Sequence, residues 1–150
     1  MSLSAKLRLG TVLLLCASLA AAQSNLGTLL DAGAKKLSPE EFKEELVLRT
    51  IVGPTATGGS LEVMYANSGV IQGIGNYGAV PIAPISGEWK VDDGRICTSM
   101  RIGVSPGGAA SGLVMLPPRC QFWFKYNEAY FLSDSDSDRS AKVLRRTVKQ

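Results

Sequence analysis

The chain has 150 residues, with 16 basic and 13 acidic side chains, a formal net charge of +3, three cysteines and no histidine. Without histidine, the chain lacks the commonest general base, the commonest zinc ligand and the usual partner of a catalytic serine or cysteine. The near balance of charge gives no sign of a general affinity for nucleic acid or anionic membranes. The length fits one domain with its own core.

The first 22 residues have the pattern of a secretory signal peptide. Lys6 and Arg8 precede a short apolar run, which the three alanines 20–22 follow. That run is shorter than the roughly 20 residues of a spanning helix, and small residues after it mark a cleavage site. We therefore expect removal of residues 1–22. The remainder, 23–150, is predicted to be a single exported domain, periplasmic or secreted, without a membrane span.

The segment 25–48 has helical character, which is clearest in "LSPEEFKEELV". Ser38 can cap a helix there, Pro39 suits its first position, and Glu41 completes a capping box. A helix of about two turns is marginal in isolation, so it must dock on the rest of the domain. The sequence predicts one N-terminal helix with Phe42 on its apolar stripe.

Beyond residue 48, β-branched and aromatic residues alternate with polar ones, and turn signals recur. "SLEVMYANSGVIQGIG" predicts a hairpin that turns at 67–69, and "GEWKVDDGRICTSM" predicts another that turns at 92–94. "CQFWFKYNEAYFL" predicts a third, turning near 126–128, and "AKVLRRTVK" can form a last strand. These elements predict a mainly β fold, an antiparallel meander that forms a small barrel or sandwich with the helix over an open edge or end.

Cys97 and Cys120 both lie beyond the predicted signal peptide. In an oxidising compartment, such a pair favours a disulfide over a metal site or a nucleophile. In the chain-entropy account, a loop of this length contributes roughly 3 kcal/mol to stability. The predicted disulfide would hold the base of the segment 102–118, which is rich in Gly, Ser and Pro. Its apolar part, 113–116, is interpreted as a short packed strand or as a lid over a pocket, and its periodicity favours the strand.

Two motifs resemble ligand sites. "GIGNYG", 73–78, matches the G-x-G-x-x-G pattern of dinucleotide-binding folds, but "AVPIAP" follows, and its prolines deny a helix the N–H donors that a pyrophosphate needs. We therefore interpret these glycines as turn and bulge positions and expect no cofactor.

The second motif comprises Asp134, Asp136 and Asp138, which match the first three ligand positions of an EF-hand loop. Arg139 stands where that loop needs glycine, and Arg145 stands where it needs glutamate. The favoured interpretation is a solvated connection whose carboxylates pair with the basic last strand. The alternative is a calcium-binding protein or a carboxylate-based enzyme that uses residues 134–138.

An aromatic cluster lies in the third predicted hairpin. Trp123 is expected on the face opposite Phe122 and Phe124, which makes it the first candidate for contact with a ligand or partner. Met115 and Tyr126 are further candidates, and we expect a pocket lined by residues such as Met115 and Phe122.

The segments "LSPEEFKEEL", "GEWKVDDGRICTS" and "PRCQFWFKYNEAYF" carry a resemblance. The chain resembles a group of small uncharacterised exported proteins of proteobacteria with a W-x-V…G-x-x-C…C core, over most of residues 28–133. No activity is assigned in that group. The resemblance therefore implies export and the disulfide, and it implies no catalytic residue.

These patterns together predict a non-enzymatic exported binding or interaction module. Its partner is expected to be a small apolar ligand or an envelope protein, with no nucleic acid and no cofactor. Besides the carboxylate-based alternative, an inhibitor of a secreted hydrolase is open by analogy, because small disulfide-bonded β domains with one projecting loop suit that task.

Overall fold

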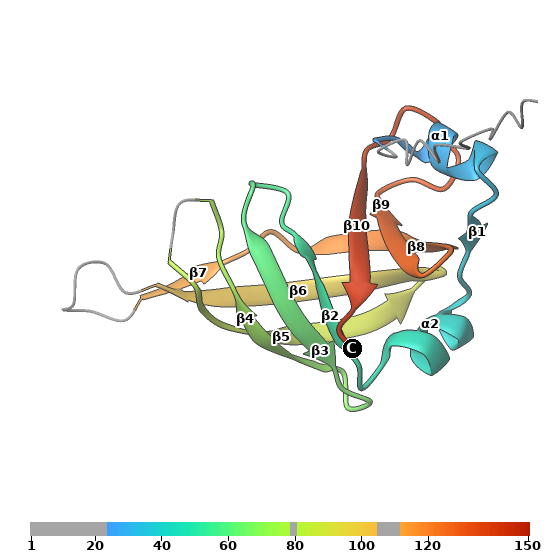
Figure 1. The fold of residues 1–150 in the computed structure, drawn as a ribbon. Coiled ribbons are helices and arrows are strands. Elements are labelled where there is room, and N and C mark those ends of the chain that lie inside the picture. Colours follow the sequence, from blue (N-terminus) through green and yellow to red (C-terminus); the bar gives the residue numbers. More distant parts are fainter. Residues whose placement is uncertain (1–23, 79–80, 105–111) are drawn as a thin grey trace, which may run out of the picture.

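The computed structural model describes residues 24–78, 81–104 and 112–150 (Figure 1). The predicted signal peptide, 1–22, lies outside these residues. Two helices and ten strands are described, and every strand pairing is antiparallel. The strands are β1 (Lys35–Lys36), β2 (Thr50–Pro54), β3 (Ser60–Tyr65), β4 (Val70–Gly75), β5 (Ala83–Asp92), β6 (Arg95–Val104), β7 (Gly112–Met115), β8 (Arg119–Tyr126), β9 (Ala129–Ser133) and β10 (Val143–Val148).

The fold is a closed antiparallel barrel of eight strands, which confirms the predicted mainly β class and selects barrel over sandwich. Strands β2 to β6 follow one another as neighbours, and β8, β9 and β10 complete the ring. Two seams close it, one where Thr147 of β10 pairs with Val52 of β2, and one where Cys97 of β6 pairs with Cys120 of β8. The predicted Cys97–Cys120 disulfide is present across the second seam.

The three predicted hairpins are confirmed as β3–β4, β5–β6 and β8–β9. Their turns use the residues that the sequence supplied for left-handed backbone, as at Gly69 (φ 85°) and Asn127 (φ 52°). Gly73 and Gly75 lie in regular pairs within β4, where a Cβ on Gly73 would meet the carbonyl oxygen of Glu62. Gly73 and Gly75 thus allow close strand packing rather than the bulges we expected, whereas Gly78 (φ 62°) lies in a turn, as expected. A strand, β5, begins at Ala83.

Two helices precede the barrel, where the sequence predicted one. The helix α2 (Pro39–Leu46) has the expected capping box, since the Glu41 N–H donates to Ser38 Oγ at 3.1 Å and the Ser38 N–H donates to Glu41 Oε2 at 2.7 Å. The other helix is α1 (Leu26–Asp31), which lies within the segment 25–48 that we expected to be helical but is separate from α2; Asn25 caps it by accepting the Thr28 N–H at 2.9 Å. The chain between the helices forms β1 beside β8. None of the described helices is long and apolar enough to cross a membrane.

The core has two parts. Inside the barrel, α2 inserts Phe42, whose ring meets those of Tyr65, Trp89 and Trp123 at centroid distances of 5.5, 5.5 and 5.1 Å. These edge-on contacts close the end of the barrel where β3 ends and β5 approaches its turn. Outside the barrel, α1 packs its leucines against Phe124 and its neighbours on β8 and β9. Strand β9 is therefore buried on both faces, and no residue of it alternates to solvent.

The strand interpretation of residues 113–116 is confirmed in part. Strand β7 pairs with the outer half of β6, with Val114 opposite Ile102. The expected packing into the core is not observed for these side chains, since Leu113 is 67% exposed and Met115 is 62% exposed. Residues 105–111 of the long segment lie outside the described residues.

Candidate functional site

The barrel encloses a cavity of about 320 Å³, which falls within the roughly 300–1,000 Å³ of typical ligand pockets. Its wall is mainly apolar and aromatic, with Leu61, Tyr65, Trp123 and Leu132 among its lining residues. Its mouth is formed by the connection after β2, by Tyr77 after β4, and by the prolines that precede β8. Phe42 of α2 packs against Tyr65 and Trp123, which both line the cavity, so this helix lies at the inner end of the pocket.

Two arginines line this cavity, and of the two Arg146 is the buried one. It lies on β10, where Leu144 and Arg146 face the interior and Arg145 faces solvent. The Arg146 side chain is buried, with 6% of the residue exposed. Its Nη1 donates to the carbonyl oxygen of Pro54 at 2.6 Å and to that of Arg145 at 2.9 Å. Among the described residues, no carboxylate lies within salt-bridge distance of this guanidinium.

Tyr65 adds a hydroxyl to the same cavity. Burial raises the pKa of Tyr65 to about 12, and the positive charge of Arg146 opposes that rise. Burial also lowers the pKa of Arg146, and Tyr65 acts against that shift. The two groups therefore lie within electrostatic range of each other. At neutral pH the pair offers one positive charge and one neutral hydroxyl donor.

A polar cluster stands at the cavity mouth. Arg119 Nη2 donates to Asp134 Oδ2 at 2.8 Å, and Gln121 Nε2 donates to Asp134 Oδ1 at 2.8 Å. Both Arg119 and Gln121 also line the cavity. Asp134 thus holds the side chains of Arg119 and Gln121 in place, and it lies beside the cavity without being one of its lining residues.

The aspartates of the predicted calcium motif separate into individual contacts. Asp136 pairs with Lys36 Nζ at 2.7 Å, and a hydrogen bond from Lys36 lowers the pKa of Asp136. Asp138 accepts the Ser140 N–H at 2.9 Å, and its pKa is lowered by hydrogen bonds from the Ser140 side chain and backbone. The partners are therefore β8, β1 and a local turn, rather than the basic last strand that we expected.

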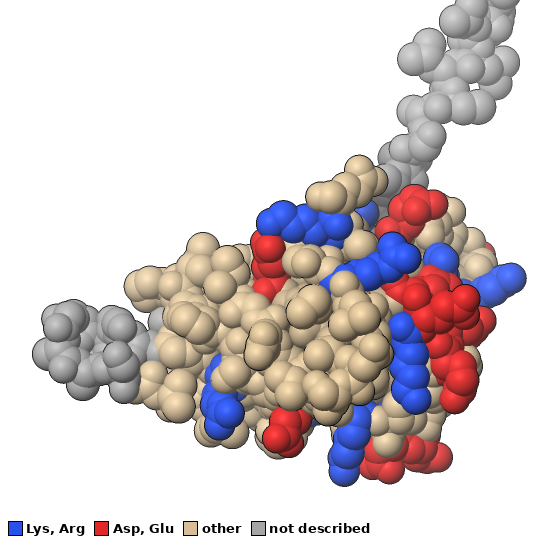
Figure 2. All heavy atoms as spheres, turned by 90° about the horizontal axis from the view of Figure 1, so that it is seen from below, with Lys and Arg blue, Asp and Glu red and all other residues tan. Residues whose placement is uncertain are grey.

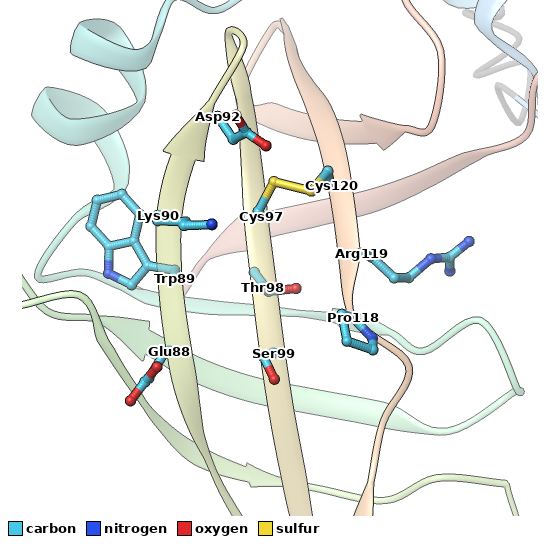
Figure 3. Close-up of a pocket in the computed structure, with 10 residues that line it drawn as sticks. All are labelled: Glu88, Trp89, Lys90, Asp92, Cys97, Thr98, Ser99, Pro118, Arg119 and Cys120. Atoms are coloured by element: carbon cyan, nitrogen blue, oxygen red, sulfur yellow. A yellow bond between two sulfur atoms is a disulfide. The ribbon is translucent and has the colours of Figure 1, made fainter.

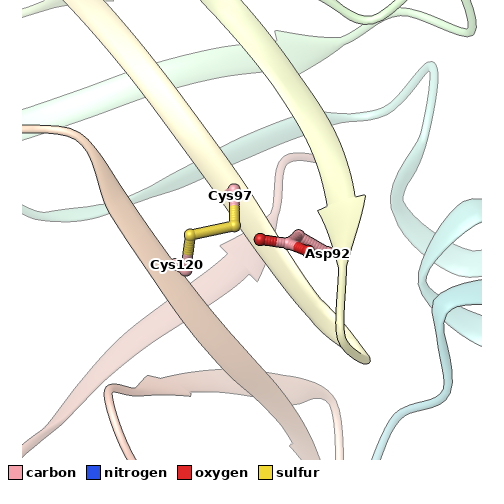
Figure 4. Close-up of side chains that lie close together, drawn as sticks. All are labelled: Asp92, Cys97 and Cys120. Atoms are coloured by element: carbon pink, nitrogen blue, oxygen red, sulfur yellow. A yellow bond between two sulfur atoms is a disulfide. The ribbon is translucent and has the colours of Figure 1, made fainter.

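One group of three potential metal ligands exists among the described residues, and it consists of Asp92, Cys97 and Cys120 (Figure 4). The two sulfurs are joined in the disulfide, so they are not available as thiolate ligands. The disulfide lies on the outer face of the barrel, in a groove of about 260 Å³ between β5, β6 and β8 (Figure 3).

On the face seen in Figure 2, basic and acidic side chains lie side by side rather than in a patch of one sign.

The residues expected to contact a ligand are spread over three places. Trp123 is in the cavity wall, with 3% of the residue exposed. Tyr126 packs against the α1 cluster, as does Phe122, which lies on the outer face of β8. Met115 lies on exposed β7, and neither Met115 nor Phe122 is among the residues that line the cavity. A ligand contact at Trp123 stays a prediction.

Sequence reasoning missed Arg146, which belongs to a strand that is rich in basic residues. A signal for it was present in the alternation, because Leu144, Arg146 and Val148 share one face of the strand. An arginine between two apolar residues on that face indicates an inward charge.

No protein-family model, curated protein or solved structure matches the chain.

Proposed function

We propose that the protein is a non-enzymatic exported binding protein that holds a small ligand inside its barrel. The observation that carries this proposal is the cavity itself. Protein interiors are normally packed with few voids larger than a water molecule, whereas this interior holds about 320 Å³ behind an open mouth. A space of that size, with an apolar wall and few polar groups, has the character of a ligand pocket.

The polar groups of the cavity support binding rather than chemistry. Arginine is protonated throughout the accessible pH range, so Arg146 cannot act as a general base near neutral pH. Tyr65, with a pKa of about 12, keeps its proton as well. The disulfide and the predicted signal peptide support export, because disulfides persist in oxidising compartments.

The proposal is tested by titrating the oxidised protein with Nile red, a neutral apolar dye. We expect dye fluorescence to saturate at one dye per chain. Leu144 lines the cavity, so Leu144→Trp should fill it and weaken dye binding about tenfold or more. Leu113→Trp is the matched control, because Leu113 is 67% exposed on β7 and its replacement should leave binding unchanged.

Two results would contradict the proposal: absence of saturable binding, or equal effects of the two tryptophan substitutions. Native mass spectrometry of the protein purified without added ligand is the companion measurement. An additional mass that survives purification would identify the ligand directly.

A further inference from the structure

We infer that the barrel binds an amphipathic anion, whose carboxylate or phosphate head group pairs with Arg146 and whose apolar chain lies along the aromatic wall. This inference rests on the proposed function and specifies the class of ligand. It is carried by a charge without a counter-charge, by the space made for that charge, and by the chemistry of the surrounding wall.

Arg146 is a buried charge. An ionised group inside a protein is unfavourable unless it is paired, and breaking a buried pair leaves an uncompensated charge. Arg146 is 6% exposed and has no carboxylate partner among the described residues. Its only described acceptors are two backbone carbonyls, which carry no net charge. An anionic ligand would supply the missing counter-charge.

Arg146 also has N–H donors that its two carbonyl partners do not engage. A guanidinium has five N–H donors, and the two carbonyls engage only Nη1. The Nε and Nη2 groups of Arg146 have no acceptor among the described residues. They are also not sealed in the protein, since Arg95 Nε is the only described side-chain atom that is both enclosed and unpaired. Arg146 is one of the residues that line the cavity, so we infer that these donors are available to a ligand there.

Gly53 of β2 makes room for this guanidinium. A Cβ on Gly53 would lie 2.9 Å from Arg146 Nη1 and 3.0 Å from Arg146 Cδ. The absence of a side chain at Gly53 therefore lets the arginine lie against β2, with its Nε and Nη2 donors left for a ligand. Such a fork matches the two oxygens of a carboxylate or phosphate better than an ammonium would.

Other lining residues of the cavity can contact the rest of the ligand. Tyr65 supplies a neutral hydroxyl that can donate to the same head group. Leu61, Trp123 and Leu132 supply apolar surface for the rest of the ligand. The other charge of the lining, Arg119, is already paired with Asp134 at 2.8 Å. The site therefore fits one anionic head on an apolar chain.

The test compares three ligands with the same chain and different heads: decanoate, decyl phosphate and decanol. Calorimetric titration of the oxidised protein should show that at least one anion binds about tenfold or more tightly than decanol. In Arg146→Met the anion should bind about 10- to 100-fold more weakly, as expected for loss of hydrogen bonds between charged groups, while decanol binding is unchanged. Arg145→Met is the matched control, because Arg145 is the exposed neighbour on the same strand.

The outcomes separate the two proposals. If decanol binds as tightly as both anions, or if Arg146→Met leaves anion binding unchanged, the inference is overturned while the binding function stands. If none of the three ligands and no Nile red binds, both fail. Because the comparison of heads uses the unaltered protein, it remains decisive even if Arg146→Met does not fold. The ratio of decanoate to decyl phosphate affinity identifies the head group.

Discussion

Gly53 and Arg146 face each other across the seam between β2 and β10, and the missing side chain of one makes room for the guanidinium of the other. This relationship links the closure of the barrel to the charge inside it. A change at Gly53 should therefore affect both stability and ligand binding.

Gly53→Ala places a methyl group 2.5 Å from the Arg145 carbonyl oxygen and 2.9 Å from Arg146 Nη1. We expect a loss of about 1–3 kcal/mol in the free energy of unfolding, the usual cost of overpacking, together with weaker anion binding. Urea denaturation measures the first effect and calorimetry the second. Gly103→Ala is the control, because the nearest atoms there are 3.6 Å away and the change should stay within about 0.5 kcal/mol. Equal effects of the two substitutions would contradict this account of Gly53.

Phe42 fastens α2 into the end of the barrel through three aromatic contacts. Phe42→Ala should lower the free energy of unfolding by about 3–5 kcal/mol, because it removes a buried ring and leaves a cavity. Urea denaturation followed by tryptophan fluorescence reports on this region, since Trp89 and Trp123 touch the ring. Leu113→Ala, on exposed β7, should cost less than about 0.5 kcal/mol. A small effect of Phe42→Ala would show that the end of the barrel holds without α2.

The disulfide supports a short seam, since β6 and β8 share only three residue pairs. Replacing Cys97 and Cys120 by serine should cost roughly 3 kcal/mol in the chain-entropy account. Hydrogen exchange should then accelerate first in the residues of this seam, 96–98 and 119–121, while the β3–β4 hairpin keeps its protection. Uniform acceleration throughout the sheet would instead mean that the barrel opens only as a whole.

Glu45 joins α2 to the barrel, since it accepts hydrogen bonds from Lys125 Nζ at 2.6 Å and from Tyr130 Oη at 2.7 Å. Burial raises the pKa of Glu45, but these hydrogen bonds outweigh burial and bring the pKa below its ordinary value of 4.5. A lowered carboxyl pKa stabilises the fold above the unfolded value, and that stabilisation is lost as pH falls through the folded value.

Glu45→Gln should therefore be less stable than the unaltered protein at pH 7, by up to about 1 kcal/mol because the Lys125 partner is largely solvated. The two melting temperatures should converge as the pH falls below 4.5 and through the lowered folded pKa of Glu45. Glu44→Gln is the matched control on the same helix, because Glu44 is exposed and makes no ion pair among the described residues. A difference between Glu45→Gln and the unaltered protein that persists in acid would assign the role of Glu45 to packing.

The hairpins were predictable because each depends on a turn and on alternation within a few residues. The choice between barrel and sandwich was not, since closure depends on β2 meeting β10 and β6 meeting β8, and both pairings are remote in sequence. Helix α1 was missed as a separate element because it is six residues long and gains its stability by packing on β8 and β9.

The candidate site was predictable only in part, for reasons of register. Sequence alternation placed Trp123 and Phe122 on opposite faces of β8, but both faces of that strand are covered, so alternation alone could not say which face was interior. The sequence predicts Arg146 only as one member of a basic last strand. Its inward direction emerges only once β10 is placed against β2.

The seam between β2 and β10 also has a consequence for biogenesis. The edge of β2 has no covering strand until β10, far later in the sequence, has been synthesised and delivered. Pairings between such distant segments are slow to form, and an open strand edge is a template for association with other chains. Closure of this seam is therefore the step at which a newly made chain competes with aggregation, and a ligand held by Arg146 beside it would favour the closed form.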